Sequence, residues 1–152
     1  MSSEKNLILA FDPGRDKTGF ALLNFDGELI FSGIFPSEGR GEFFDMILNE
    51  KNIEEFLIEN SQRANKKFLS RIKFLAVGNG THGKEFYENV KNKFSFEIKI
   101  IDEKNTTLEA RKLYWKIHKP GFFARLLPEG LRVPARVLDD LAAYAIGLRA
   151  IH

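Results

Sequence analysis

Acidic side chains stand at three points where an apolar stretch of this 152-residue sequence ends or packs. Asp12 directly follows the apolar run 7–11, and Asp102 and Glu103 follow another run that ends at residue 101. Asp139 lies within a third apolar stretch, near the end of the sequence. Because removing a lone carboxylate from water is costly, acidic residues beside buried elements indicate a site that compensates them with a cation.

The chemistry open to such a group of oxygen donors begins with a metal ion. The sequence has no cysteine, and carboxylates without thiolates favour a hard cation such as Mg²⁺ or Mn²⁺. Two such ions held about 3.5–4 Å apart stabilise both the attacking and the leaving oxygen of a phosphodiester displacement. Because the carboxyl ends of parallel strands meet at one edge of a sheet, Asp12 and Glu103 would lie together there if their strands run parallel. A final helix packed across that edge would add Asp139.

Each acidic residue also has a purely structural interpretation. Asp12 precedes Pro-Gly and fits a turn, Asp102 and Glu103 fit solvated strand ends, and Asp139 fits a helix N-cap. The N-cap interpretation weakens if the last helix begins at Pro134, a residue suited to the first helical position, because Asp139 then lies one turn inside. The residues alone leave both sets of interpretations open.

Hydrophobic patterns predict the elements that would position these side chains. The run 7–11 is typical of a strand buried on both faces, and strand-like runs at 20–25 and 28–35 flank Asp26-Gly27, a strong hairpin signal. The remaining patterns predict a helix at about 42–69, a strand at 72–77, a helix at 82–94, a strand at 96–101, a helix beginning with a Thr106/Glu109 capping box, a loop at 119–133 and a last helix. This order predicts an α/β fold in which a mixed five-stranded sheet carries helices on both faces.

Charge is distributed unevenly along the sequence. Residues 42–60 hold six acidic side chains and one lysine, whereas residues 111–136 hold seven basic side chains and one glutamate. A polyanion would be repelled by the first segment and attracted by the second, although both also fit ordinary solvated helix faces. Phe122 and Phe123 lie within the basic segment, where they are typical either of core residues or of rings that stack on unpaired bases.

The composition fits a single globular domain spanning residues 1–152. Apolar residues make up 43% of the sequence, and no repeat or linker divides it. No apolar stretch approaches the length of a membrane span, and the first residues do not resemble a signal peptide. We therefore expect a cytoplasmic protein that has no membrane partner.

Three blocks of the sequence resemble the YqgF (RuvX) family, and they occur in the family's order. Residues 10–22, Ala-Phe-Asp-Pro-Gly-Arg-Asp-Lys-Thr-Gly-Phe-Ala-Leu, are similar to its opening strand and Asp-x-Gly turn. Residues 102–110, Asp-Glu-Lys-Asn-Thr-Thr-Leu-Glu-Ala, resemble its Asp-Glu-Arg-x-Thr-Thr-x-x-Ala block, with Lys104 in place of the usual arginine. Residues 139–143, Asp-Asp-Leu-Ala-Ala, resemble its terminal Asp-x-x-Ala-Ala block. Residues 77–81, Val-Gly-Asn-Gly-Thr, instead resemble the related domain of the transcription factor Tex, and they fit either a plain turn or a backbone-amide site for phosphate.

This resemblance implies a ribonuclease H-like nuclease. It implies Asp12, Glu103 and Asp139 as catalytic residues that bind metal, Asp140 as a further metal ligand, and Mg²⁺ or Mn²⁺ as the cofactor. The first candidate function that it implies is maturation of the 5′ end of pre-16S ribosomal RNA, and the second is Holliday-junction resolution. A nucleic-acid-binding module without catalysis is a third candidate, favoured if the acidic residues prove too dispersed to hold a metal.

Nucleic acid is the partner that the sequence predicts, with RNA preferred over structured DNA. We expect the chain to be a monomer or a weak dimer, because no heptad seam or spare apolar helix face is visible in the sequence. The basic side chains expected to contact nucleic acid are Arg15, Lys17, Lys104, Arg111, Lys119, Arg125, Arg132 and Arg136.

Overall fold

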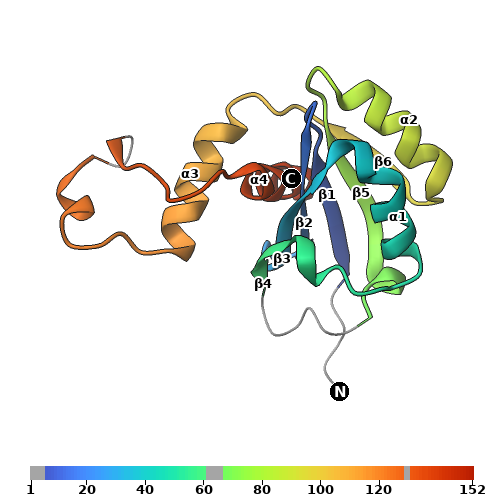
Figure 1. The fold of residues 1–152 in the computed structure, drawn as a ribbon, viewed down its shortest axis with the longest axis horizontal. Helices are drawn as coiled ribbons and strands as arrows, with labels where there is room; N and C mark the ends of the chain where they lie inside the picture. Colours follow the sequence, from blue (N-terminus) through green and yellow to red (C-terminus); the bar gives the residue numbers. More distant parts are fainter. Residues whose placement is uncertain (1–5, 61–66, 129–130) are drawn as a thin grey trace.

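A six-stranded mixed sheet forms the centre of the computed structural model, which describes residues 6–60, 67–128 and 131–152 (Figure 1). The strand order is β4-β3-β2-β1-β5-β6. The strands are β1 (Leu7–Asp12), β2 (Lys17–Asn24), β3 (Leu29–Pro36), β4 (Leu57–Asn60), β5 (Ile72–Gly78) and β6 (Glu97–Ile101). The helices are α1 (Arg40–Leu48), α2 (Gly83–Lys93), α3 (Thr106–Ile117) and α4 (Asp139–Ile151).

Strand directions follow the expectation from the sequence. β1 pairs antiparallel with β2, and β2 pairs antiparallel with β3 across the predicted hairpin turn. In that turn Gly27 has a φ of 85°, which a residue without a Cβ adopts at little cost. β1 pairs parallel with β5, and β5 pairs parallel with β6. The carboxyl ends of these three strands therefore lie at the same edge of the sheet.

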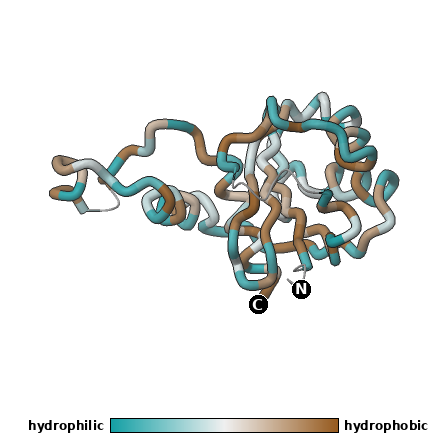
Figure 2. Tube along the Cα trace, turned by 90° about the horizontal axis from the view of Figure 1, so that it is seen from below, coloured by the Kyte–Doolittle hydropathy of each residue, from teal (hydrophilic) through white to brown (hydrophobic). Residues whose placement is uncertain are grey.

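The two faces of the sheet are covered by different helices, as predicted (Figure 1). Successive residues of β1 alternate between them: Leu9 and Phe11 join the core beneath α1 and α2, whereas Ile8 and Ala10 pack against α4. Figure 2 shows this apolar character along the strands. The alternation continues to the end of β1, so Asp12 falls on the face that α4 covers.

The predicted helix at about 42–69 is wrong beyond residue 48. α1 ends in a Schellman motif: the Lys51 N–H donates to the Met46 carbonyl and the Glu50 N–H to the Ile47 carbonyl, with Glu50 at a φ of 49°. Without glycine at that left-handed position, the sequence carries no visible stop. Residues 57–60 then form β4 at the sheet edge, which makes six strands rather than five. The part of the predicted helix at 61–66 lies outside the described residues.

The predicted capping box of one helix and the predicted start of the last helix are also wrong. α3 begins at Thr106 with Asn105 as its N-cap, and the Thr106 hydroxyl donates to the Glu103 carbonyl (2.9 Å), so no Thr106/Glu109 capping box forms. α4 begins at Asp139 rather than at Pro134. Asp139 therefore occupies the first helical position, where the free N–H groups and the helix dipole favour an acidic side chain.

Between α3 and α4 the chain extends away from the sheet, on the far side of α3 (Figures 1 and 2). We call residues 119–128 and 131–137 the basic arm; residues 129 and 130 lie outside the described residues. The arm corresponds to the loop predicted at 119–133, lengthened because α4 begins later. Among the described residues, no helix is long and apolar enough to cross a membrane.

Candidate active site

The structure brings Asp12 and Glu103 together at the carboxyl edge of the parallel strands. Asp12 is the last residue of β1 and Glu103 is the second residue after β6, and Glu103 lies close enough to raise the pKa of Asp12. Because two neighbouring carboxylates repel each other, Asp12 favours its protonated form here in the absence of a cation. The meeting of these two residues was expected from parallel strands, and the strand directions confirm its basis.

The carboxylate of Glu103 lies in a cradle formed by two glycines. A Cβ at Gly78 would lie 2.3 Å from Oε2, and a Cβ at Gly80 would lie 1.7 Å from Oε1. Any larger residue at either position would displace the carboxylate. Among the described residues, no N–H or hydroxyl group is bonded to the buried Oε2 atom. The cradle therefore holds an oxygen with an unsatisfied lone pair beside Asp12.

The pKa of Asp12 is raised to about 8. Burial is the largest cause, followed by the charge of Glu103, the hydrogen bond to Glu103 and the charge of Asp139. At neutral pH the Asp12 carboxyl is thus mostly protonated when nothing else neutralises the site. A perturbed carboxyl of this kind at the ligand-binding edge of a sheet is typical of a functional site.

Asp139 approaches the pair from α4. The backbone of Asp139 lies directly over Gly19, which pairs with Asp12 in the β1–β2 ladder. A Cβ at Gly19 would lie 1.9 Å from the Asp139 carbonyl oxygen. The pKa of Asp139 is raised, first by burial and further by Asp140, while Lys17 opposes the shift. The absence of a side chain at Gly19 is therefore what allows the first turn of α4 to reach the carboxylate edge.

The carboxylates of Asp12, Glu103 and Asp139 are suitable ligands for a metal ion, but their positions in this structure do not form a metal site. Among the described residues, no three His, Asp or Glu side chains are arranged so that they could hold a metal ion. The donors nevertheless suit a hard cation: Asp12 and Glu103 are in contact, one Glu103 oxygen is unpaired, and Asp139 is close enough to raise the pKa of Asp12. A divalent cation would replace the proton that the raised pKa of Asp12 retains.

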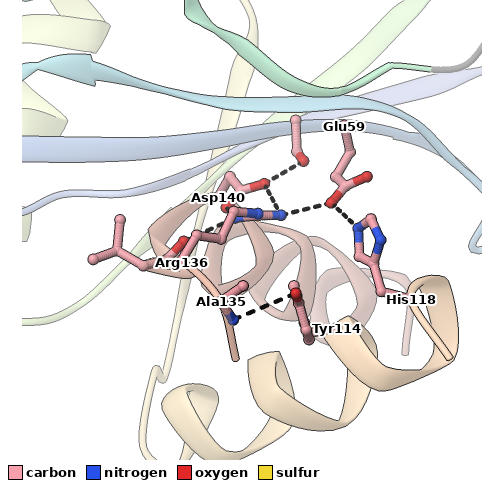
Figure 3. A network of polar contacts seen from close by, with 8 residues as sticks. Glu59, Tyr114, His118, Ala135, Arg136 and Asp140 are labelled. Atoms are coloured by element: carbon pink, nitrogen blue, oxygen red, sulfur yellow. Dashed lines mark hydrogen bonds and ion pairs between the residues drawn. The ribbon is translucent and has the colours of Figure 1, made fainter. Parts of the chain in front are cut away.

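Asp140 lies in a different set of contacts (Figure 3). It is fully buried, its Oδ2 accepts a hydrogen bond from the Ser32 hydroxyl (2.6 Å), and its Oδ1 accepts one from Arg136 Nη1 (2.7 Å). Arg136 also binds Glu59 Oε2 (2.6 Å), which His118 Nε2 contacts at 2.6 Å. The structure thus does not bring Asp140 into the Asp12–Glu103 pair, and it places Arg136 in an ion-pair network instead of leaving it free for a ligand.

No protein-family model matches this sequence, and no curated protein matches it. Among solved structures, the chain is similar to T. thermophilus RuvC in complex with a Holliday junction substrate. The two chains share 13% sequence identity and superpose with a TM-score of 0.50, over 96% of this chain and 93% of RuvC. The fold is ribonuclease H-like. At this identity the likeness to RuvC establishes the fold alone.

Within the ribonuclease H-like fold, sequence reasoning missed the residue that anchors the Glu103 turn. Arg149 of α4 donates to the backbone carbonyls of Asp102 and Lys104 (2.6 Å each) and pairs with Glu109 (2.9 Å). The two carbonyls flank Glu103, so Arg149 fixes the turn that presents its carboxylate. Its position in the last turn of the final helix gives no signal in the sequence, because basic residues are common there for electrostatic reasons alone.

The turn after β5 has a structural role in the ribonuclease H-like fold. The Asn79 N–H donates to the Ile101 carbonyl (3.0 Å), and the Asn79 side chain accepts the Glu103 N–H (3.2 Å). The Asn79 N–H is therefore not available to a phosphate. This favours the plain-turn interpretation of residues 77–81 over the phosphate-binding one.

The remaining basic residues form two groups. Arg15 and Lys17 border a shallow depression that Asp139 also lines, and Lys104 is exposed next to Glu103. Arg111, Lys119 and Arg125 are exposed on α3 and on the basic arm, and Arg132 donates to the Ala124 carbonyl within the arm (3.0 Å). The first group adjoins the carboxylates, whereas the second lies on the projecting part of the molecule.

Proposed function

We propose that this protein is a metal-dependent nuclease that hydrolyses phosphodiester bonds in nucleic acid. The observation that carries the proposal is the Asp12–Glu103 pair, with Asp139 beside it, at the edge of a ribonuclease H-like sheet. Burial and, after it, the neighbouring like charges raise the pKa of Asp12 there to about 8. A divalent cation is the partner that would stabilise such a group in its charged form.

In this proposal Asp12, Glu103 and Asp139 hold Mg²⁺ or Mn²⁺. The bound ion would supply an activated water for in-line attack and neutralise the leaving oxygen, giving a 5′-phosphate and a 3′-hydroxyl. The protein's own part is positional: the Gly78/Gly80 cradle and Arg149 hold Glu103, and Gly19 admits the first turn of α4. Arg15 and Lys17, which border the depression beside Asp139, would hold the phosphate backbone.

We propose an RNA substrate, first of all the 5′ end of pre-16S ribosomal RNA, on the basis of the resemblance to the YqgF family. Two other functions are each favoured by one observation. The likeness to RuvC, whose structure contains a Holliday junction substrate, favours junction resolution. The lack of a ready three-residue metal set among the described residues favours a binding module without catalysis.

Cleavage assays on the intact chain separate the three functions. The wild type is incubated with a leader–rRNA mimic and with a four-way DNA junction, in Mg²⁺, in Mn²⁺ and in EDTA. We expect cleavage of the RNA that requires the metal and is lost in Asp12→Asn. Asp45→Asn is the matched control, because Asp45 is an exposed carboxylate of α1, which covers the other face of the sheet.

The other outcomes reassign the function. Paired symmetric nicks in the junction, with the RNA intact, would make the protein a resolvase. Tight binding without cleavage of either substrate would make it a binding module. Equal cleavage by wild type and Asp12→Asn would contradict the role given to the carboxylate pair.

A further inference from the structure

The basic arm exposes an unusual number of large apolar side chains. Phe123 is 80% exposed and Phe122 is 65% exposed, so the interpretation of these rings as core residues is wrong. The other exposed apolar residues of the arm are Leu126, Leu127, Leu131, Val133 and Val137. Contiguous apolar surface on a soluble protein generally marks a binding site. Figure 2 shows the apolar residues alternating with polar ones along the projecting arm.

Hydrogen bonds within the arm give it a defined local structure. Residues Ala124–Leu126 form a 3₁₀ turn, and Arg132 Nε donates to the Ala124 carbonyl (3.0 Å), which ties the returning chain to that turn. The rings of Phe122 and Phe123 meet edge to face, with centroids 5.4 Å apart and planes at 84°. Two rings held nearly at right angles in this way, each mostly exposed, present two separate apolar ring faces to a ligand.

Both ends of the arm are fastened to the same carboxylate oxygen. His118, which precedes the arm, and Arg136, near its end, each contact Glu59 Oε2 at 2.6 Å (Figure 3). Arg136 also binds Asp140, the neighbour of Asp139. The base of the arm is therefore attached to the residue that follows Asp139 of the candidate active site.

The positive charge of the basic arm indicates the class of ligand that it binds. Residues 111–136 carry seven basic side chains and one glutamate, and Lys119 and Arg125 are exposed next to the exposed rings. A purely apolar protein partner would not require this charge. Nucleic acid with unpaired bases supplies both complements: phosphates for the cations and flat π faces for the rings.

We propose that the basic arm binds single-stranded segments of nucleic acid, with Phe122 and Phe123 stacking on unpaired bases and Lys119 and Arg125 binding the phosphates beside them. This inference rests on the proposed function and deepens it, because it names unpaired nucleic acid as the substrate class. Base-paired duplexes are discriminated against, since their bases are already stacked and do not present a free face.

Equilibrium binding of the intact chain in EDTA tests the arm without any cleavage. The probes are a single-stranded oligonucleotide that contains 2-aminopurine and the same strand in a duplex. We expect the wild type to change 2-aminopurine fluorescence in the single strand and to bind the duplex more weakly. Phe123→Ala should weaken single-strand binding by about 5- to 150-fold, the range that corresponds to the loss of one stacked base, and should reduce the fluorescence change.

Substitutions matched in size distinguish stacking from plain apolar contact. Phe123→Leu keeps apolar surface but loses the ring, so it should behave like Phe123→Ala, whereas Phe123→Tyr should behave like the wild type. The double variant Lys119→Ala/Arg125→Ala should lower the log–log salt slope by about 0.7 for each phosphate of a single strand that it no longer binds. Phe123→Ala should leave that slope unchanged.

Three results would overturn the inference. The first is single-strand binding of wild-type strength in Phe123→Ala. The second is full retention of binding and of the fluorescence change in Phe123→Leu. The third is self-association of the wild type that the phenylalanine variants abolish while nucleic-acid binding persists, which would assign the arm to a second copy of this chain. Because the assay contains no metal, these results are independent of whether the protein cleaves.

Discussion

Asp12 has a pKa far above that of an aspartate in water. Its pKa is raised from the ordinary aspartate value of 3.8 to about 8, so the folded protein holds a proton there that the unfolded chain releases above pH 4. Its contribution to stability is therefore fully present below pH 4 and is lost as the pH rises toward 8. Without a cation, Asp12 thus destabilises the fold at neutral and alkaline pH.

Asp12→Asn should remove this pH dependence. At pH 8 the variant should have a free energy of unfolding higher than that of the wild type by about 1–3 kcal/mol, the scale of an uncompensated buried polar group, and the two should converge near pH 4. Urea unfolding at a series of pH values in EDTA measures the difference. A gap that is constant with pH, or that widens toward acid, would mean that Asp12 is not the protonated member of the pair.

At the residue scale, sequence predicted the meeting of Asp12 and Glu103 because both follow strands that run parallel. The sequence could not show which side chains contact Asp139 and which contact Asp140. Adjacent residues in the first turn of a helix point in different directions, and only the positions of Ser32 and Arg136 show which carboxylate is neutralised. The signal that could have separated them is the i, i+4 spacing of Arg136 and Asp140, which is typical of an ion pair.

At the element scale, the approach of α4 to β2 determines where Asp139 lies. Gly19→Ala would place a Cβ 1.9 Å from the Asp139 carbonyl oxygen, so the first turn of α4 must shift. We expect a loss of about 1–3 kcal/mol in the free energy of unfolding, the range for overpacked sites, together with weaker Mn²⁺ binding. Calorimetry with and without Mn²⁺ gives both quantities.

Gly41→Ala is the matched control for that substitution. Gly41 lies in α1, and a Cβ there would meet no atom within 4 Å. It should stabilise the protein by about 0.4–1 kcal/mol and leave Mn²⁺ binding unchanged. If Gly19→Ala behaved in the same way, the close contact between β2 and α4 would not be what positions Asp139.

The errors in the elements predicted from the sequence share a physical cause. The stop of α1 and the start of α4 depend on tertiary contacts or on a non-glycine residue at positive φ, neither of which leaves a local pattern. β4 was hidden because Ile53, Phe56 and Leu57 fall at helical spacing although they belong to a short 3₁₀ helix with its N-cap and to an edge strand. Elements buried on both faces, such as β1 and β5, were predicted well because their continuous apolar runs leave few alternatives.

At the scale of the whole molecule, metal binding should stabilise the fold in a pH-dependent way. A cation must displace the proton of Asp12, so the affinity of the site for the cation should rise with pH up to about 8, the pKa of Asp12. The increase in Tm produced by a fixed concentration of Mn²⁺ should therefore be larger at pH 8 than at pH 6. Differential scanning fluorimetry measures it, with Asp12→Asn as the variant that should show little increase. An equal increase at both pH values would locate the bound ion elsewhere.

The global architecture was predictable from the sequence, whereas the way its parts cooperate was not. The order of strands and helices predicted a mixed α/β sheet, and the family resemblance implied a ribonuclease H-like fold. The structural likeness to RuvC bears this fold out. The basic segment was visible as charge, but its projection from the body, its exposed rings and its attachment through Glu59 depend on contacts between residues far apart in the sequence.

The most direct test of the central claim is a crystal structure of the protein soaked in Mn²⁺, with anomalous diffraction to locate the ion. We expect anomalous density in contact with both Asp12 and Glu103, with the Asp139 carboxylate turned toward it, and no such density in Asp12→Asn. Anomalous density confined to other carboxylates, or none at saturating Mn²⁺ in the wild type, would contradict the assignment of this edge of the sheet as a metal-dependent active site.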